Sequence, residues 1–219
     1  MTVGQIEKKT QDRVVKLFQD TLHYTYLGNL EERENSNIEK KLLEKYLKDK
    51  YDDSLIQKAI SELEKVATNQ TKSLYDLNKD VYNYLRYGIA VKENVGDKNQ
   101  TIELINWNKP QENNFYIAEE VTVIGEHEKR PDIILYVNGI PLVIIECKSP
   151  FIPQWLEEAV EKKNFKRYRS TGNGYERLMF YNHILVATCG TQARHGTISS
   201  DTNQFEKSRW SSAYPLSVE

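Results

Sequence analysis

The sequence is poor in the residues that mark disulfide-rich, zinc-binding or membrane-spanning proteins. It has only two cysteines, Cys147 and Cys189, in 219 residues. Neither has a cysteine or histidine neighbour at metal-ligand spacing, so a structural zinc site is not expected. The longest apolar runs are too short to cross a bilayer, and no signal peptide is recognisable. These features predict a protein of the reducing cytoplasm.

The sequence also lacks an excess of charge of either sign. It has 30 lysines and arginines against 32 acidic residues, for a formal net charge of −2. Affinity for nucleic acid would therefore have to come from local patches. No glycine-rich Walker loop occurs, so the chain itself is not expected to bind ATP.

What is present is an ordinary globular composition, with 39% hydrophobic and 28% charged residues. Apolar residues at helical spacing predict helices at 6–22, 38–47, 54–66, 74–85 and 155–168. Alternating or continuous apolar runs predict strands at 88–91, 101–107, 115–123, 132–137, 141–147 and 184–188. Residues 23–34 are predicted to form a loop. The fold class predicted is α/β, a mixed central sheet flanked by helices, with an N-terminal helical region at 1–86, a core at 87–200 and a C-terminal segment at 201–219.

Three charged residues interrupt the two most apolar predicted strands. Asp132 opens the first strand, and Glu146 and Lys148 lie two residues apart in the second, so they face the same way. Ionised groups in apolar surroundings are costly unless they are paired or bind a metal. Two converging carboxylates suit Mg²⁺ or Mn²⁺, which can activate water, and a neighbouring ammonium can orient that water. The alternative is a plain ion pair of Glu146 with Lys148 or of Asp132 with Arg130.

This pattern resembles the PD-(D/E)xK nuclease signature, carried here by Pro131-Asp132 and Glu146-Cys147-Lys148. The wider sequence is similar to the N-terminal nuclease domain of type I restriction endonuclease R (motor) subunits. That similarity extends from about residue 5 to about residue 200. Its other elements are Glu7-Lys8-Lys9-Thr10-Gln11, Tyr26-Leu27-Gly28-Asn29, Leu74-Tyr75 with Asn78, Leu85-Arg86-Tyr87-Gly88, Glu119-Glu120-Val121 and Asn138-Gly139-Ile140-Pro141.

The resemblance implies a restriction-endonuclease-like fold and a Mg²⁺-dependent type I site-specific deoxyribonuclease that acts on double-stranded DNA. Asp132 and Glu146 would bind the cation, with the backbone carbonyl of Cys147 as a further ligand, and Lys148 would assist the attacking water. It also implies methyltransferase and specificity subunits as partners, and an ATP-driven motor that follows residue 219. The competing functions are a non-catalytic DNA-binding or subunit-docking module of the same fold and a free-standing DNA-repair nuclease.

Several supporting residues have plainer explanations beside the functional one. Glu7 could be an extra acid near the metal, or a surface glutamate that suits the helix dipole. Many relatives have Gln-x-x-x-Tyr after the lysine strand; here Asn164 and Tyr168 occupy those positions, with the shorter amide, and Tyr168 could simply pack on the sheet. A basic cluster could contact DNA phosphates or form a solvated helix face: Lys162, Lys163, Lys166, Arg167 and Arg169. Glu119 and Glu120 are adjacent on a predicted strand, so at most one should face the site.

The turn at Asn138-Gly139 decides whether the two carboxylates can share a metal. A regular two-residue turn pairs Val137 with Ile140, which places Asp132 opposite Ile145 and turns Glu146 to the other face. A three-residue loop would pair Tyr136 with Ile140 and bring both carboxylates to one face. We therefore predict an odd-length loop or a bulge, with Gly139 at positive φ.

Overall fold

The computed structural model describes residues 3–33, 37–67, 69, 71–123, 130–163, 165, 179–200 and 211–212. Its centre is a seven-stranded mixed sheet in the spatial order β1-β4-β5-β6-β7-β8-β9. The strands are β1 (Thr25–Asn29), β4 (Phe115–Glu119), β5 (Ile133–Val137), β6 (Ile140–Cys147), β7 (Ile184–Thr188), β8 (Ala193–Gly196) and β9 (Ser211–Ser212). Strand pairs β1–β4 and β6–β7 are parallel and the others are antiparallel, which confirms the predicted α/β class.

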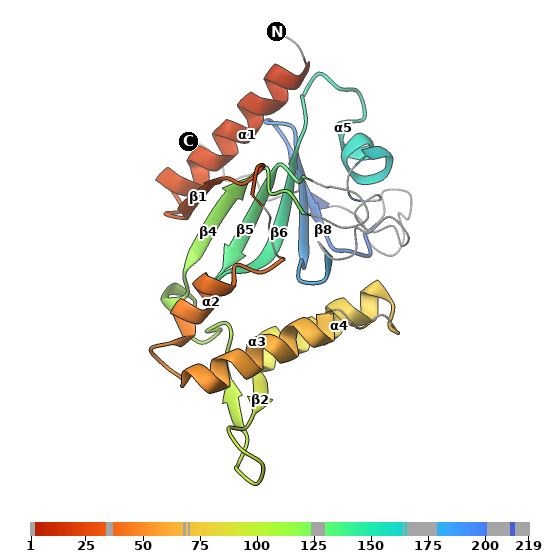
Figure 1. Ribbon diagram of the computed structural model, residues 1–219. Coiled ribbons are helices and arrows are strands. Elements are labelled where there is room, and N and C mark those ends of the chain that lie inside the picture. Colours follow the sequence, from red (N-terminus) through yellow and green to blue (C-terminus); the bar gives the residue numbers. More distant parts are fainter. Residues whose placement is uncertain are drawn as a thin grey trace.

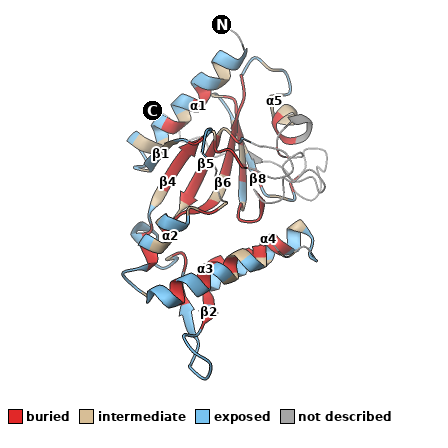
Figure 2. Cartoon of the chain, in the orientation of Figure 1, coloured by how far each residue is buried: buried red, intermediate tan, exposed pale blue. Residues whose placement is uncertain are grey.

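Helices pack on both faces of this sheet (Figure 1). The α1 helix (Val3–Asp20) covers one face, where Val15 packs against alternate sheet residues such as Ile133 and Ile145. The short helix α5 (Trp155–Glu157) continues as a π-helix at Glu158–Lys163 on the other face, where Ala159 and Val160 pack on the intervening residues. The strands between these layers are mostly buried (Figure 2), as expected for a sheet covered on both sides.

Three helices and a small hairpin form a lobe at the other end of the sheet from α1 (Figure 1). The helices are α2 (Lys40–Leu47), α3 (Asp53–Ala67) and α4 (Leu74–Tyr87), and the hairpin strands are β2 (Ile89–Val91) and β3 (Gln100–Ile102). A 3₁₀ turn, η1 (Pro110–Glu112), leads into β4. Within the described ranges, none of the helices has the length and apolar character needed to cross a membrane.

The prediction of a loop at 23–34 is wrong in part, because this segment holds β1. Gly28 and the neighbouring asparagines favour a turn on local grounds. Parallel pairing with β4 overrides that preference, and Gly28 takes a φ of 103° where the register shifts between Tyr26 and Gly28. β8 was not predicted either. The N-terminal part of the chain therefore supplies both a strand of the central sheet and the helix α1 that covers it.

The turn between β5 and β6 has two residues, so the three-residue loop and the pairing of Tyr136 with Ile140 are wrong. Asn138 and Gly139 have φ values of 53° and 94°, typical of a type I′ turn, and Val137 pairs with Ile140. A bulge then follows, because Tyr136 pairs with Pro141 but Leu135 pairs with Val143, leaving Leu142 as the extra residue. The predictions of a bulge and of positive φ at Gly139 are confirmed.

Replacing Gly139 with alanine is expected to lower the free energy of unfolding by roughly 2–3 kcal/mol, from backbone strain plus steric conflict. A Cβ at Gly139 would lie 2.5 Å from the backbone oxygen of Glu39, at the start of α2. Gly96→Ala is the matched control, since Gly96 also has a positive φ, 102°, but no heavy atom within 4 Å of an added Cβ. Thermal melts should show a clearly larger loss at Gly139; equal losses would mean that the contact with α2 does not matter.

A buried amide joins α4 to the segment that leads into β7. The Asn78 side-chain nitrogen donates to the backbone oxygens of Met179, Phe180 and Asn182, and its oxygen lies 3.1 Å from Nδ1 of His183. Burial lowers the pKa of His183 to about 4. The uncharged imidazole therefore stabilises the fold above its unfolded pKa, and protonation opposes folding below it.

Acid should consequently destabilise the protein in part through His183. Between about pH 6.5 and about pH 4 the free energy of unfolding is expected to fall by roughly 2–3 kcal/mol more than in a His183→Gln variant. Urea unfolding of both proteins across this pH range measures the difference. Parallel pH profiles for the two proteins would show that His183 does not titrate in this window.

Candidate active site

The bulge in β6 brings Asp132 and Glu146 to the same face of the sheet. Beyond the bulge, Ile133 pairs with Ile145 and Ile134 with Ile144. The same register continued by one residue sets Asp132 opposite Glu146, on the face of the sheet that carries Ile134 and Ile144. Glu146 is only 1% exposed, although it is the second-to-last residue of β6.

Lys148 lies directly beside this pair. Its ammonium nitrogen is 3.6 Å from Oε2 of Glu146 and donates to the backbone oxygen of Cys147 at 3.1 Å. The backbone nitrogen of Lys148 donates to the backbone oxygen of Thr188 at 2.7 Å, which ties the residue to β7 after β6 has ended. The lysine is 7% exposed, so its charge is largely removed from water.

The carboxylate of Asp132 is held by the neighbouring strand. Its Oδ2 accepts a 2.6 Å hydrogen bond from the backbone nitrogen of Cys147. The alternative for Asp132 was an ion pair with Arg130. Arg130 instead pairs with Glu31 and, at 2.9 Å from its Nε, with Glu120. Glu146 and Lys148 do form an ion pair, and it is buried rather than at the surface.

The electrostatics of the site reflect this burial. Burial raises the pKa of Asp132, and the nearby negative charge of Glu7 raises it further, against the opposing effects of Lys148 and the Cys147 N–H. Burial alone would lower the pKa of Lys148, but Glu146 and Asp132 outweigh it and the pKa is raised. Lys148 therefore stays a cation at neutral pH. Burial also raises the pKa of the Cys147 thiol, which fits an inert side chain.

The donors in this region are the kind that Mg²⁺ prefers. Two carboxylates and the backbone carbonyl of Cys147 supply hard oxygen atoms, while burial raises the pKa of the Cys147 thiol, so its surroundings do not ionise it as a soft ligand would be. In the described part of the chain no group of three or more His, Cys, Asp or Glu side chains could hold a metal. Mg²⁺ commonly binds through one or two carboxylates and keeps several waters, so the donor set fits this ion.

Glu7 lies on α1 and acts electrostatically on Asp132 of the carboxylate pair. Its charge acts on Asp132, Lys148 and Cys147, which places it in the electrostatic neighbourhood of the carboxylate pair. The sequence identified it only through its position in the first helix.

The expectation that Glu119 and Glu120 point to opposite faces is wrong. β4 ends at Glu119, and Glu120 takes a left-handed φ of 49°, which breaks the alternation of a regular strand. Both side chains therefore reach α1, where Glu119 accepts from Lys8 at 3.0 Å and Glu120 accepts from Gln11 at 2.9 Å. The sequence singled out Gln11 only as part of the resemblance and did not indicate the contact it makes, because nothing in the helix pattern marks an amide as buried.

The remaining predicted site residues lie outside the described side chains. Asn164, Tyr168, Lys166, Arg167 and Arg169 fall on undescribed residues, and for Lys162 and Lys163 only the backbone is described, within the π-helix. Their predicted roles stay predictions. The predicted helix at 155–168 is described only through Lys163 and at Phe165, which is buried against the sheet.

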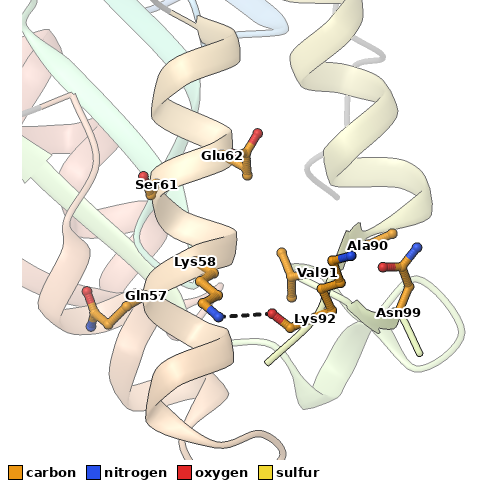
Figure 3. A pocket seen from close by; sticks show the side chains of 8 residues that line it. All are labelled: Gln57, Lys58, Ser61, Glu62, Ala90, Val91, Lys92 and Asn99. Atoms are coloured by element: carbon orange, nitrogen blue, oxygen red, sulfur yellow. Dashed lines mark hydrogen bonds between the residues drawn. The ribbon is translucent and has the colours of Figure 1, made fainter. Parts of the chain in front are cut away.

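In the part of the chain that the structure describes, two surface hollows lie away from the carboxylate pair. One of about 460 Å³ lies between α3 and the β2–β3 hairpin in the helical lobe (Figure 3), and is lined by Gln57, Lys58, Ser61, Glu62, Ala90, Val91, Lys92 and Asn99. The ammonium of Lys58 is already engaged by the backbone oxygens of Lys92 and Glu93. With a single carboxylate in its lining, this hollow offers fewer oxygen ligands for a cation than the sheet end does.

Comparison with known proteins gives a family match for most of the chain. Residues 5–204 match the family described as the type I restriction enzyme R protein N terminus. The chain is 29% identical over 153 residues to the type I restriction enzyme HindI endonuclease subunit of Haemophilus influenzae, covering 66% of this chain and 14% of the relative. It is 30% identical over 133 residues to a Methanocaldococcus jannaschii protein assigned by name to the MjaIXP type I restriction enzyme as an endonuclease subunit, covering 58% of this chain and 12% of the relative. The chain thus matches only about an eighth of the length of these proteins.

Proposed function

Because this chain belongs to the family of type I restriction enzyme R protein N termini, we propose that it is the nuclease domain of such a subunit. Its reaction would be the Mg²⁺-dependent hydrolysis of phosphodiester bonds in double-stranded DNA. The observation that carries the proposal is the bulge in β6, whose register sets Asp132 on the same face of the sheet as the buried pair of Glu146 and Lys148. A hairpin without the bulge would have turned Asp132 and Glu146 to opposite faces.

Each residue of the site has a separate role in the proposed reaction. Asp132, Glu146 and the backbone carbonyl of Cys147 would hold Mg²⁺ or Mn²⁺. When bound, such an ion polarises a phosphate oxygen and lowers the pKa of a water ligand. Lys148 keeps its proton, so it can orient the attacking water and offset negative charge that develops on the phosphate. The Cys147 N–H fixes one oxygen of Asp132, so the carboxylate is oriented before substrate arrives.

The whole-protein function follows from the family and is part of the proposal. The relatives are named endonuclease subunits and are several times longer than this chain. We propose that the intact protein works with methyltransferase and specificity subunits, and that an ATP-driven motor outside this chain moves the DNA. The recognition sequence would then be read by a partner subunit.

Metal titration tests the catalytic proposal directly. Isothermal titration calorimetry should show binding of Mg²⁺ and Mn²⁺ to the wild-type chain and little binding to Asp132→Asn. In the complete complex, cleavage of plasmid DNA should require the divalent cation. A module that only holds DNA or docks other subunits has no need of the ion, so absence of cation binding would favour that function. Efficient cutting without partner subunits would favour a free-standing repair nuclease.

A further inference from the structure

A buried amide on α1 contacts the backbone of the first carboxylate residue. Gln11 is 4% exposed, and its Nε2 donates both to Oε1 of Glu120 at 2.9 Å and to the backbone oxygen of Asp132 at 3.1 Å. These partners are 109 and 121 residues away in the sequence. A buried amide nitrogen is costly to leave without hydrogen-bond acceptors, so these two contacts specify how α1 docks on the sheet.

The same backbone oxygen accepts a second hydrogen bond. The backbone nitrogen of Glu120 donates to the oxygen of Asp132 at 3.0 Å, while the Asp132 carboxylate accepts from Cys147 at 2.6 Å. Asp132 precedes β5 and lies outside the paired ladder of that strand. Its position therefore depends on these three bonds, one from the helix and two from the neighbouring chain segments.

Glu120 holds Gln11 in position rather than binding the metal. One of its carboxylate oxygens accepts from Gln11, and the other lies 2.9 Å from Nε of Arg130. Its left-handed backbone, at a φ of 49°, is unfavourable for a residue with a side chain and is held in place by these contacts. With both oxygens engaged, Glu120 acts as an anchor for α1.

Gln11 also determines where Glu7 lies. The two residues are four apart on α1 and share one face of the helix. Docking of Gln11 on Asp132 therefore brings the preceding turn toward the carboxylate pair, which accounts for the effect of Glu7 on Asp132 and Lys148.

We propose that Gln11 is a positioning residue of the active site, which holds the backbone of Asp132 and thereby the metal-binding carboxylate. This inference rests on the proposed function, since it concerns the same carboxylates. Gln11→Met keeps the length and bulk of the side chain but removes the donor. Because loss of such an outer contact weakens metal sites, Mn²⁺ affinity measured by calorimetry should fall by about 10–100-fold. Lys16→Ala, an exposed position on the same helix, is the matched control and should bind as the wild type does.

A double variant separates positioning of Asp132 from simple docking of the helix. In Gln11→Glu with Glu120→Gln, an amide and a carboxylate still face each other, so α1 can dock, but residue 11 has no donor for the oxygen of Asp132. Thermal stability in chelator should recover relative to Gln11→Glu alone, while Mn²⁺ affinity should stay low.

The outcomes distinguish this inference from the proposed function. Wild-type Mn²⁺ affinity in Gln11→Met, or its full return in the double variant, would overturn the positioning role and leave the nuclease proposal intact. Failure of the unaltered chain to bind Mg²⁺ or Mn²⁺ would overturn both. Weak binding in Gln11→Met and in the double variant, with normal binding in Lys16→Ala, supports the positioning role.

Discussion

Replacing Lys148 with alanine is expected to reduce DNA cleavage by the complete complex by about 100- to 1,000-fold or more. The ammonium lies close to both Glu146 and the Cys147 carbonyl, and it keeps its proton at neutral pH. Its loss removes the group that orients water and offsets charge on the phosphate, while both carboxylates remain. Single-turnover cleavage of plasmid DNA measures the effect, and the exposed lysine of α4 in Lys79→Ala is the control.

The same substitution should also affect stability, contrary to what a lysine at a strand end suggests. Because Lys148 is buried with Glu146, its removal takes the neighbouring ammonium away from a buried carboxylate. In chelator the free energy of unfolding should fall by on the order of 3 kcal/mol. Saturating Mg²⁺ should restore much of this loss, because the cation takes over part of the neutralising role. A folded Lys148→Ala protein that binds Mg²⁺ and cleaves at the wild-type rate would disprove the catalytic assignment.

Replacing Asp132 with asparagine is expected to weaken Mg²⁺ and Mn²⁺ binding by at least about 100-fold, since even loss of an outer contact costs about 10–100-fold. Asparagine keeps an oxygen that can accept from the Cys147 N–H, so the local backbone should be retained. At a Mg²⁺ concentration about 100 times the dissociation constant, the wild type should gain roughly 2.7 kcal/mol of stability, or about 5–10 °C in melting temperature. The variant should gain almost none; equal gains would show that Asp132 is not a ligand.

The same variant should reveal the cost of the buried charge in the absence of metal. Burial raises the pKa of Asp132, so the folded protein binds the Asp132 proton more tightly than the unfolded chain does. A carboxyl with a raised pKa stabilises the fold below its unfolded pKa, and that contribution is lost as the pH rises through the folded value. In chelator, the melting temperature of Asp132→Asn relative to wild type should therefore increase between about pH 4 and about pH 7. A difference that does not change with pH would place the carboxylate in a more solvated setting.

Local sequence patterns were sufficient to predict most of the helices and strands and to single out the charged residues of the site. The period of apolar residues identified the helices from α1 to α4 and the strands β4 to β7, because burial of one face imposes that period. Asp132, Glu146 and Lys148 could be singled out because charges inside apolar strands are costly and need a reason. The glycine at residue 139 indicated a positive φ, since the turn requires it.

Contacts between distant segments decided the other features of the fold and of the site. β1 forms because β4 offers it a partner, although its own residues favour a loop. The bulge at Leu142, and not the length of the turn, brings Asp132 and Glu146 to one face, since one extra residue changes the parity of the whole strand. Nε2 of Gln11 donates to the backbone oxygen of Asp132, which is 121 residues away in the sequence. It also donates to Glu120, whose left-handed φ departs from the strand pattern. The sequence by itself thus determined which groups are present for the chemistry. Only the tertiary structure decided on which face of the sheet these groups lie and which residues hold them in position. The reason is that hydrogen bonds between distant segments leave no periodic signal along the chain.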